Sequence, residues 1–311
     1  MDSRVDPELR AMLSMMPRED FRKEDLNELR AGMATAFGPA VTNFPDCTVT
    51  DRRIPGPEGA AQVRVRLYDP AGPARNRPGV LYIHGGGYIL GTPEMTDSSC
   101  AGIAAALGAV VASVDYRLAP EHPFPAPLED CYAALAWFAD NAPALDADRD
   151  NIAVVGGSAG GGLAAALALL ARDRKGPRIT FQAPLYPMLD DRNITPSSRE
   201  FTDPRVWSRD KNIFAWESYL GPLYGGDVPQ YAAPARALNL AGLPPAYTFV
   251  GALDLFRDET TDYVTRLLQA GVPTEFHIYP GCFHGFDMFP TEIGRRAAAG
   301  LIDALKRALV K

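Results

Sequence analysis

The sequence predicts an α/β protein, in which helices flank both faces of a mostly parallel, twisted sheet. Two observations predict this class. Short apolar runs typical of strands buried on both faces recur along the chain, and helical patterns fall between most of them. The 311 residues, of which 47% are hydrophobic and 22% charged, can form a large core. These proportions exclude a disordered or fibrous protein.

The first elements in chain order are two helices and an exposed strand. Apolar residues recur at helical spacing over 5–16 and over 21–37, with Pro17 between the two segments. Residues 63–67 then alternate between apolar and basic side chains, which predicts an antiparallel strand with one exposed face.

The rest of the chain alternates between strands and helices. Buried strands are predicted at 79–83, 110–114, 152–155, 179–185, 246–250 and 276–279, and helices at 96–107, 128–139, 159–172, 259–270 and 292–310. The interval between 185 and 246 is far longer than an ordinary crossover connection, and such a length is typical of a lid. We therefore expect cap helices in 1–45 and a cap insert at about 190–240, over a main domain spanning 46–311.

Charge and cysteine usage exclude several classes of partner. With 31 basic and 38 acidic residues, the chain lacks the basic excess that a nucleic-acid surface needs. Charged residues near the N-terminus argue against a signal peptide, and the longest apolar stretch is too short to cross a bilayer. We therefore expect a soluble, cytoplasmic protein with no membrane contact. Four widely spaced cysteines without a CxxC pair predict free buried thiols.

A serine motif gives the strongest local signal. Ser158 lies in Gly156-Gly-Ser-Ala-Gly160, between a predicted strand and a predicted helix, which is the spacing of a nucleophile elbow. In such a turn the serine has a strained backbone, so its hydroxyl projects outward, and the helix N-terminus adds positive potential. A phosphate-binding turn is the alternative, but neither common glycine spacing for phosphate binding is present.

A glycine-rich loop follows the strand at 79–83. In His84-Gly85-Gly86-Gly87-Tyr88, successive glycines leave backbone N–H groups unshielded, so they can converge on an oxyanion. We interpret His84 as a structural residue that holds this loop in shape.

A serine nucleophile needs a base and an orienting acid, which follow it in the order acid, then histidine. Of the four histidines, only His284 lies in a loop just past the last predicted strand, since the others lie upstream, in a proline-rich loop or within a strand. Asp254 comes just beyond the strand at 246–250. Ser158, Asp254 and His284 would then all lie beyond the carboxyl ends of parallel strands, where open α/β sheets place their sites.

The ordered motifs together resemble the hormone-sensitive-lipase-like (HGGG) family of α/β-hydrolase carboxylesterases. The resemblance covers about 45–310 and rests on His84–Gly87, Asp115–Pro125, Gly156–Gly160, Asp254–Asp258 and His284–Phe286. It implies the α/β-hydrolase fold with a helical cap over the substrate pocket. It also implies that Ser158 is the nucleophile, Asp254 the acid and His284 the base.

Further site residues follow from the same resemblance. The oxyanion hole is expected from Gly85, Gly86 and Gly87, with N–H donors at Gly86 and Gly87, and from Ala159. Substrate contacts are expected from Tyr88, Trp207 and Phe214. The chain departs from the family at Gly157, where an acidic residue is usual, and at Asp254-Leu-Phe256, where Asp-Pro-Leu is usual. The second departure predicts a less rigid acid loop.

These residues predict a serine esterase that hydrolyses short- to medium-chain carboxylic esters through an acyl-enzyme, with no metal or organic cofactor. One alternative is an amidase or deacetylase with the same triad. The other is a non-catalytic ligand receptor, since a fold alone does not imply an activity. The expected partner is a small-molecule ester, and the resemblance also suggests a homodimer through the sheet edge or the last helix.

Overall fold

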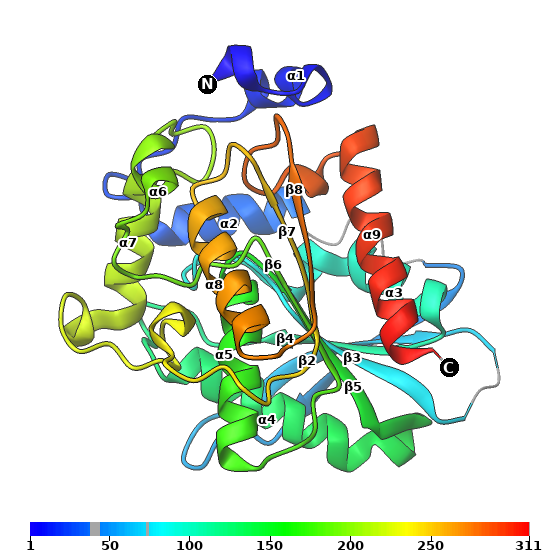
Figure 1. Ribbon diagram of the computed structural model, residues 1–311. Helices are drawn as coiled ribbons and strands as arrows, with labels where there is room; N and C mark the ends of the chain where they lie inside the picture. The colour runs from blue at the N-terminus through cyan, green and yellow to red at the C-terminus, as the bar shows by residue number, and fades with distance from the viewer. Residues whose placement is uncertain (38–43, 73–74, 311) are drawn as a thin grey trace.

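The computed structural model describes residues 1–37, 44–72 and 75–310, in which one sheet forms the centre of the molecule (Figure 1). Its strand order is β1-β2-β4-β3-β5-β6-β7-β8. The strands are β1 Cys47–Ile54, β2 Val63–Pro70, β3 Arg77–Ile83, β4 Val110–Asp115, β5 Ala147–Gly157, β6 Phe181–Leu185, β7 Ala246–Gly251 and β8 Thr274–Tyr279. Strand β2 is antiparallel to β1 and β4, and the other pairs are parallel. The predicted α/β class and the antiparallel strand are confirmed.

Strand β1 has no counterpart among the predicted strands. Only its first and last residues, Cys47 and Ile54, are buried, because β1 is an edge strand that carries Asp51, Arg52 and Arg53 toward solvent. An edge strand of this kind has charged residues at most positions, so it lacks the apolar alternation by which strands are predicted.

Helices pack on both faces of the sheet. Helix α3 (Asp97–Leu107) contacts α9 (Glu292–Leu309), and α4 (Ala126–Asn141) contacts α5 (Ala159–Arg174), while α8 (Arg257–Gln269) packs on β7 and β8. Short 3₁₀ turns lie between these elements: η1 Asp2–Arg4, η2 Pro93–Thr96, η3 Ala142–Leu145, η4 Gly221–Leu223, η5 Pro234–Arg236 and η6 Phe286–Met288. The predicted helices in this part of the chain are all present, with ends shifted by one or two residues.

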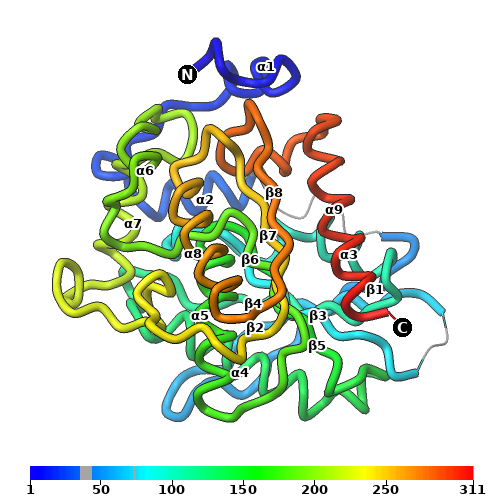
Figure 2. The backbone as a smooth tube through the Cα atoms, viewed as in Figure 1, coloured from blue at the N-terminus to red at the C-terminus, as the bar shows by residue number. Residues whose placement is uncertain are grey.

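Four more helices come from the N-terminal segment and from the long interval after β6. They are α1 (Pro7–Met15), α2 (Leu26–Phe37), α6 (Pro196–Glu200) and α7 (Arg209–Leu220). The predicted helix at 21–37 begins only at Leu26, because the carboxylates of Asp20 and Asp25 accept nearby backbone N–H groups and so favour turns. In Figure 2, α1 lies beyond the ends of β7 and β8, and α6 and α7 lie to one side of the sheet.

Ion pairs join these two segments of the chain. Arg22 pairs with Glu217 at 2.7 Å, and Lys211 pairs with Glu19 at 3.0 Å. Further pairs are Asp2 with Arg205 and Arg4 with Glu200. Residues far apart in sequence therefore form one surface layer. That this layer acts as a cap, over a main domain at 46–311, stays a prediction.

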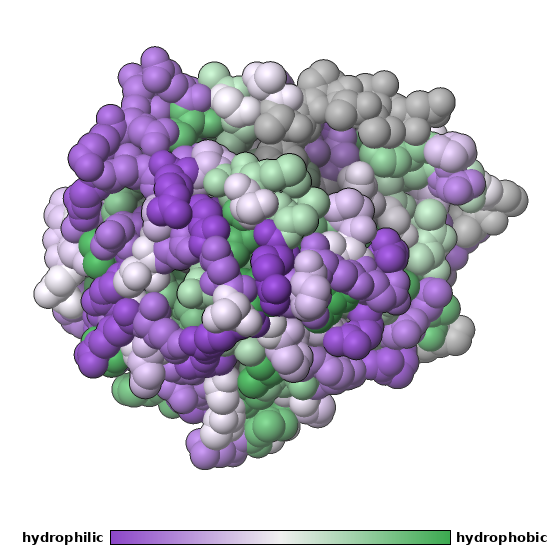
Figure 3. All heavy atoms as spheres, turned by 90° about the horizontal axis from the view of Figure 1, so that it is seen from above, coloured by the Kyte–Doolittle hydropathy of each residue, from purple (hydrophilic) through white to green (hydrophobic). Residues whose placement is uncertain are grey.

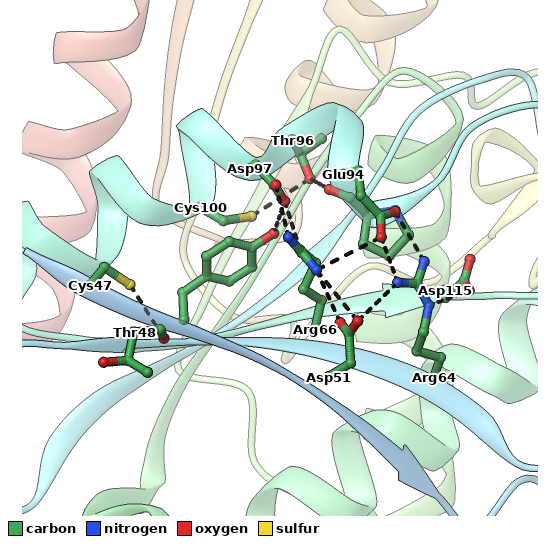
Figure 4. Close-up of polar contacts among 12 residues, drawn as sticks. Cys47, Thr48, Asp51, Arg64, Arg66, Glu94, Thr96, Asp97, Cys100 and Asp115 are labelled. Atoms are coloured by element: carbon green, nitrogen blue, oxygen red, sulfur yellow. Dashed lines mark hydrogen bonds and ion pairs between the residues drawn. The ribbon is translucent and has the colours of Figure 1, made fainter. Parts of the chain in front are cut away.

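A polar cluster joins β2 to the start of α3 (Figure 4). Arg64 Nε lies 2.8 Å from Asp115, and Arg64 Nη1 lies 2.5 Å from Glu94. Arg66 makes two hydrogen bonds to Asp97, at 2.9 and 3.1 Å. Basic residues on the outer face of an antiparallel strand thus serve as anchors for the helix above it.

The structure bears on the predictions about the cysteines and about membrane crossing. Cys47, Cys100, Cys131 and Cys282 are all free and buried, as predicted. Within the described residues, none of the helices combines the length and the apolarity that a membrane crossing requires.

Candidate active site

Ser158 lies on a strained turn between β5 and α5. Its φ and ψ are 59° and −121°, a region that few residues other than glycine adopt. A Cβ on Gly156 would lie 2.3 Å from the Gly160 carbonyl oxygen, and one on Gly160 would lie 2.1 Å from that of Ile83. Only glycines permit this approach of strand and helix, and the resulting sharp turn holds the serine at the carboxyl end of β5.

The three side chains predicted to act together form one hydrogen-bonded row. His284 Nε2 lies 2.9 Å from Ser158 Oγ, and His284 Nδ1 lies 2.8 Å from Asp254 Oδ2. They follow β5, β7 and β8, so the parallel sheet brings together Ser158 and His284, which are 126 positions apart. With Nδ1 protonated toward the carboxylate, Nε2 is free to accept the serine proton.

The acid is held firmly in place. Asp254 is 1% exposed, and its Oδ1 accepts the Phe256 N–H at 2.9 Å. Leu255 and Phe256 are fully buried, and the N–H of Arg257 donates to the Asp254 carbonyl at 3.1 Å. The loop therefore has restraints of its own in place of the proline that the family usually carries.

Aromatic rings surround the imidazole of His284. The ring centroids of Tyr186 and Phe256 each lie 5.1 Å from it in edge-on geometry, and that of Trp207 lies 6.3 Å away. These rings cover most of the histidine, whose side chain is 10% exposed, and restrict its rotation. The loop itself is fixed from outside, since the N–H of Asp6 donates to the Gly281 carbonyl at 3.0 Å.

The predicted oxyanion loop lies next to the serine. A Cβ on Gly85 would lie 3.4 Å from Ser158 Cβ, so the two turns are in contact. The N–H groups of Gly86 and Gly87 donate to no described residue, and Ala159 opens α5, where the helix offers its N–H no acceptor. Gly86 and Gly87 have φ of 116° and 60°, which favours glycine. These three donors are available to a ligand oxygen.

His84 has the structural environment that we expected. It is fully buried, stacks on Tyr116 with ring centroids 4.2 Å apart, and its Nδ1 lies 2.8 Å from the Gly85 carbonyl oxygen. Burial lowers the pKa of its imidazole, so the neutral form is favoured. His84 therefore supports the turn that leads from β3 into the glycine loop.

Tyr88 differs from its predicted role in substrate contact. The residue is 1% exposed, its ring stacks on Tyr219 with centroids 3.9 Å apart, and its hydroxyl donates to the Met188 carbonyl at 3.0 Å. Because both its ring and its hydroxyl are engaged in the core, we assign it to the packing of the oxyanion loop.

The other two predicted contact residues lie at different depths. A Cβ on Gly87 would lie 2.2 Å from Trp207 Cη2, so the indole lies against the oxyanion loop as well as near His284. Phe214 lies farther out, where it contacts Phe21 (6.4 Å between centroids) and carries Arg22 over its ring. Contact with substrate is therefore better supported for Trp207 than for Phe214.

Sequence reasoning missed three residues at this site. Phe21 packs edge-on against Trp207, with centroids 5.8 Å apart, and Tyr186 and Asp287 lie beside His284. Tyr186 carried a signal, since it follows a predicted strand on the same side of the sheet as the serine. Phe21 carried none, because the contact depends on how a distant segment folds over the sheet.

A serine elbow, an oxyanion loop and a Ser–His–Asp row at the carboxyl edge of a parallel sheet define an α/β hydrolase. Comparison with known proteins places the chain more narrowly. A family model described as alpha/beta hydrolase fold matches residues 80–288. Esterase LipI of Mycobacterium tuberculosis is 39% identical, with 91% of this chain and 88% of the relative covered, and carboxylesterase NlhH of the same species is 37% identical, with 98% and 96% covered.

A solved structure agrees with these relatives. A bacterial heroin esterase has a TM-score of 0.95 and 43% identity to this chain, with 99% of both chains covered. The chain therefore belongs to the hormone-sensitive-lipase-like family of α/β hydrolases. It is a carboxylesterase.

Proposed function

We propose that the protein hydrolyses short- to medium-chain carboxylic esters through an acyl-enzyme intermediate on Ser158. One observation carries the proposal: the 2.9 Å and 2.8 Å contacts that link Ser158, His284 and Asp254 lie beside backbone N–H groups that have no acceptor among the described residues. The nucleophile, its base and the oxyanion donors are then all within reach of one ester carbonyl.

Acylation begins when Ser158 Oγ attacks the ester carbonyl carbon while His284 Nε2 takes the hydroxyl proton. The carbonyl π electrons move to oxygen, and the N–H groups of Gly86, Gly87 and Ala159 stabilise the resulting oxyanion. When the tetrahedral intermediate collapses, the bond to the alcohol oxygen breaks and His284 returns its proton to that oxygen. Asp254 orients the imidazole and stabilises its charged form.

Deacylation repeats these steps with water as the nucleophile. His284 takes a proton from water, the hydroxide oxygen bonds to the acyl carbon, and the bond from that carbon to Ser158 Oγ breaks. The proton then passes from His284 to the serine oxygen, which restores the enzyme. The net reaction consumes one ester and one water and releases one carboxylic acid and one alcohol.

The surroundings of the serine support substrates of limited size. Ser158 is 6% exposed, and Trp207 lies against Gly87 and near His284, so little of the site around the serine is open to solvent. In Figure 3, which looks down on the end where α1 lies, hydrophobic side chains form small patches between hydrophilic ones. Docking to an emulsified lipid uses larger apolar surfaces. We therefore favour soluble short- and medium-chain esters over triglycerides.

The test is Ser158→Ala, assayed on p-nitrophenyl butyrate beside Ser98→Ala, an exposed serine of α3. We expect Ser158→Ala to lower kcat by about 10⁴-fold and the control to match wild type. A Ser158→Ala enzyme that keeps more than a few per cent of wild-type turnover would refute the assignment. Assay of the matched butyryl anilide decides between esterase and amidase chemistry, and labelling of Ser158 by a fluorophosphonate decides against a receptor.

The proposal also covers the oligomeric state of the protein and its location in the cell. We infer a homodimer through the β8 edge of the sheet, since Ile278 of this strand is 46% exposed and one side of β8 lacks a partner strand among the described residues. A groove of about 480 Å³ between β8 and α9 runs along the same edge. A cytoplasmic location stays a prediction, with which four free thiols are compatible.

A further inference from the structure

A second carboxyl group lies beside the histidine of the proposed row. Asp287 belongs to η6, three residues after His284. Its Oδ2 accepts a hydrogen bond from the Tyr186 hydroxyl at 3.2 Å. Its Oδ1 is sealed from solvent and has no hydrogen-bond partner among the described residues. Burial of a carboxyl oxygen without a hydrogen-bond partner costs free energy of folding, which points to a functional role for Asp287.

Tyr186 connects this carboxyl group to the imidazole. Its ring lies edge-on to that of His284, with centroids 5.1 Å apart and an interplanar angle of 81°. It is 6% exposed and has a φ of 32°, a strained value for a tyrosine. A Cβ on Gly157 would lie 2.9 Å from its hydroxyl oxygen, so the ring fills the space beside the glycine that precedes the serine.

We propose that Asp287 is a second positioning residue for His284. It fixes the Tyr186 ring against the imidazole through a hydrogen bond, and as an anion with one oxygen sealed from solvent it favours the imidazolium that forms in each half of the reaction. The proposal rests on the proposed esterase mechanism. Asp254 orients the histidine from one side by direct contact, whereas Asp287 acts through Tyr186 and through its charge.

The ionisable groups that face the Asp287 carboxyl come from four parts of the sheet edge: Tyr82 of β3, Tyr186 after β6, Asp254 after β7, and Cys282 and His284 after β8. Burial raises the pKa of Asp287 to about 6, although the Tyr186 hydroxyl and His284 favour its ionised form. Asp287 is therefore an anion at neutral pH and becomes neutral in moderately acidic solution.

The negative charge of Asp287 determines the direction in which the pH profile of catalysis shifts when the residue is replaced. The acidic limb of kcat/KM reports the protonation of the histidine that acts as base. An anionic Asp287 attracts the imidazolium and so favours the charged form of the base over the neutral form. Removal of this charge disfavours the charged form, which moves the acidic limb to lower pH. The same removal takes stabilisation from the transition state, so kcat on the plateau falls.

Asp287→Asn separates charge from packing, because asparagine has the same shape and can still accept from the Tyr186 hydroxyl. We expect the acidic limb of kcat/KM to move down by about one pH unit and the plateau kcat to fall about tenfold, with KM nearly unchanged. Asp140→Asn at the exposed end of α4 removes the same charge far from the site, and we expect neither change for it.

Tyr186→Phe tests the role of Asp287 through its hydrogen-bond partner. It keeps the ring against His284 but removes the hydrogen bond to Asp287, which then becomes neutral at higher pH. We expect a shift in the same direction as for Asp287→Asn, and no additional shift when the two substitutions are combined. Melting temperatures of all variants show whether each one folds, and Tyr186→Phe carries the test if Asp287→Asn does not.

Three outcomes would overturn the proposal: a loss of kcat with the acidic limb unmoved, a limb that moves to higher pH, or additive shifts in the double variant. Failure of the proposed function is distinguishable from these outcomes, because it would appear as an active Ser158→Ala enzyme irrespective of residue 287.

Discussion

The side chain of Trp207 lies near two parts of the site, the oxyanion loop and the histidine. Its indole lies against Gly87 of the oxyanion loop and within 6.3 Å of the His284 ring, measured between centroids. Its Nε1 donates to Asn212 Oδ1 at 3.1 Å, and Asn212 in turn donates to Asn193 Oδ1 at 2.6 Å. A ring that is hydrogen-bonded and packed in this way makes a rigid wall.

Replacement of this wall should change the preferred chain length. We expect Trp207→Ala to raise the ratio of kcat/KM for p-nitrophenyl octanoate to that for the butyrate by about tenfold, because the space left can accept several further methylenes. Phe214→Ala, farther from the serine, is the matched control and should change the ratio less than twofold. A ratio unaffected by Trp207→Ala would show that the acyl chain lies elsewhere.

Single residues also show where sequence reasoning succeeds. Ser158, Asp254 and His284 could be placed because each follows a strand, and parallel strands end at a common edge. Tyr88 and Tyr186 could not be told apart by residue type. Both follow strands, but the ring of Tyr88 turns into the core toward Tyr219, whereas that of Tyr186 turns toward the histidine. Only tertiary packing decides this.

At the scale of elements, the helices were predictable and the edge strand was not. Helix α9 has a buried apolar stripe and an exposed charged face, so apolar residues recur in its sequence at helical spacing. Strand β1 and the start of α2 depend on neighbours or on side chains that bond to the backbone. The polar cluster of β2 likewise has no linear signal, since its acids lie at Glu94, Asp97 and Asp115.

That cluster makes stability depend on pH. The Arg64 guanidinium lowers the pKa of Glu94 from 4.5 to about 2, so Glu94 stabilises the fold fully above pH 4.5 and loses this effect as the pH falls toward 2. We expect Glu94→Gln to lower the free energy of unfolding by about 2–3 kcal/mol at pH 6, and this difference to fall by more than half at pH 3.

Urea unfolding at the two pH values measures this difference. Glu58→Gln is the control, since the exposed side chain of Glu58 makes no ion pair with any described residue. A Glu94→Gln deficit that stays constant between pH 6 and pH 3 would mean that the carboxylate contributes packing and not charge.

At the scale of the whole molecule, the inferred dimer gives a direct measurement. We expect light scattering at micromolar concentration to give twice the 33.6 kDa of one chain. Ile278→Lys places a charge on the exposed β8 edge and should yield monomers, because a desolvated lysine opposes strand pairing. Leu268→Lys, on the exposed side of α8, should leave the mass unchanged. A wild-type mass of one chain would contradict the inferred assembly.

The hydrogen bond from Asp6 to the Gly281 carbonyl has a consequence for how the protein is made. Synthesis proceeds from the N-terminus, so α1 leaves the ribosome long before the loop that it holds exists. Leu9 and Leu13 of α1 are fully buried in the folded protein, and they cannot be buried in this way while α1 is the only part of the chain outside the ribosome. The contact between Asp6 and Gly281 can therefore form only late, once residue 281 has been translated.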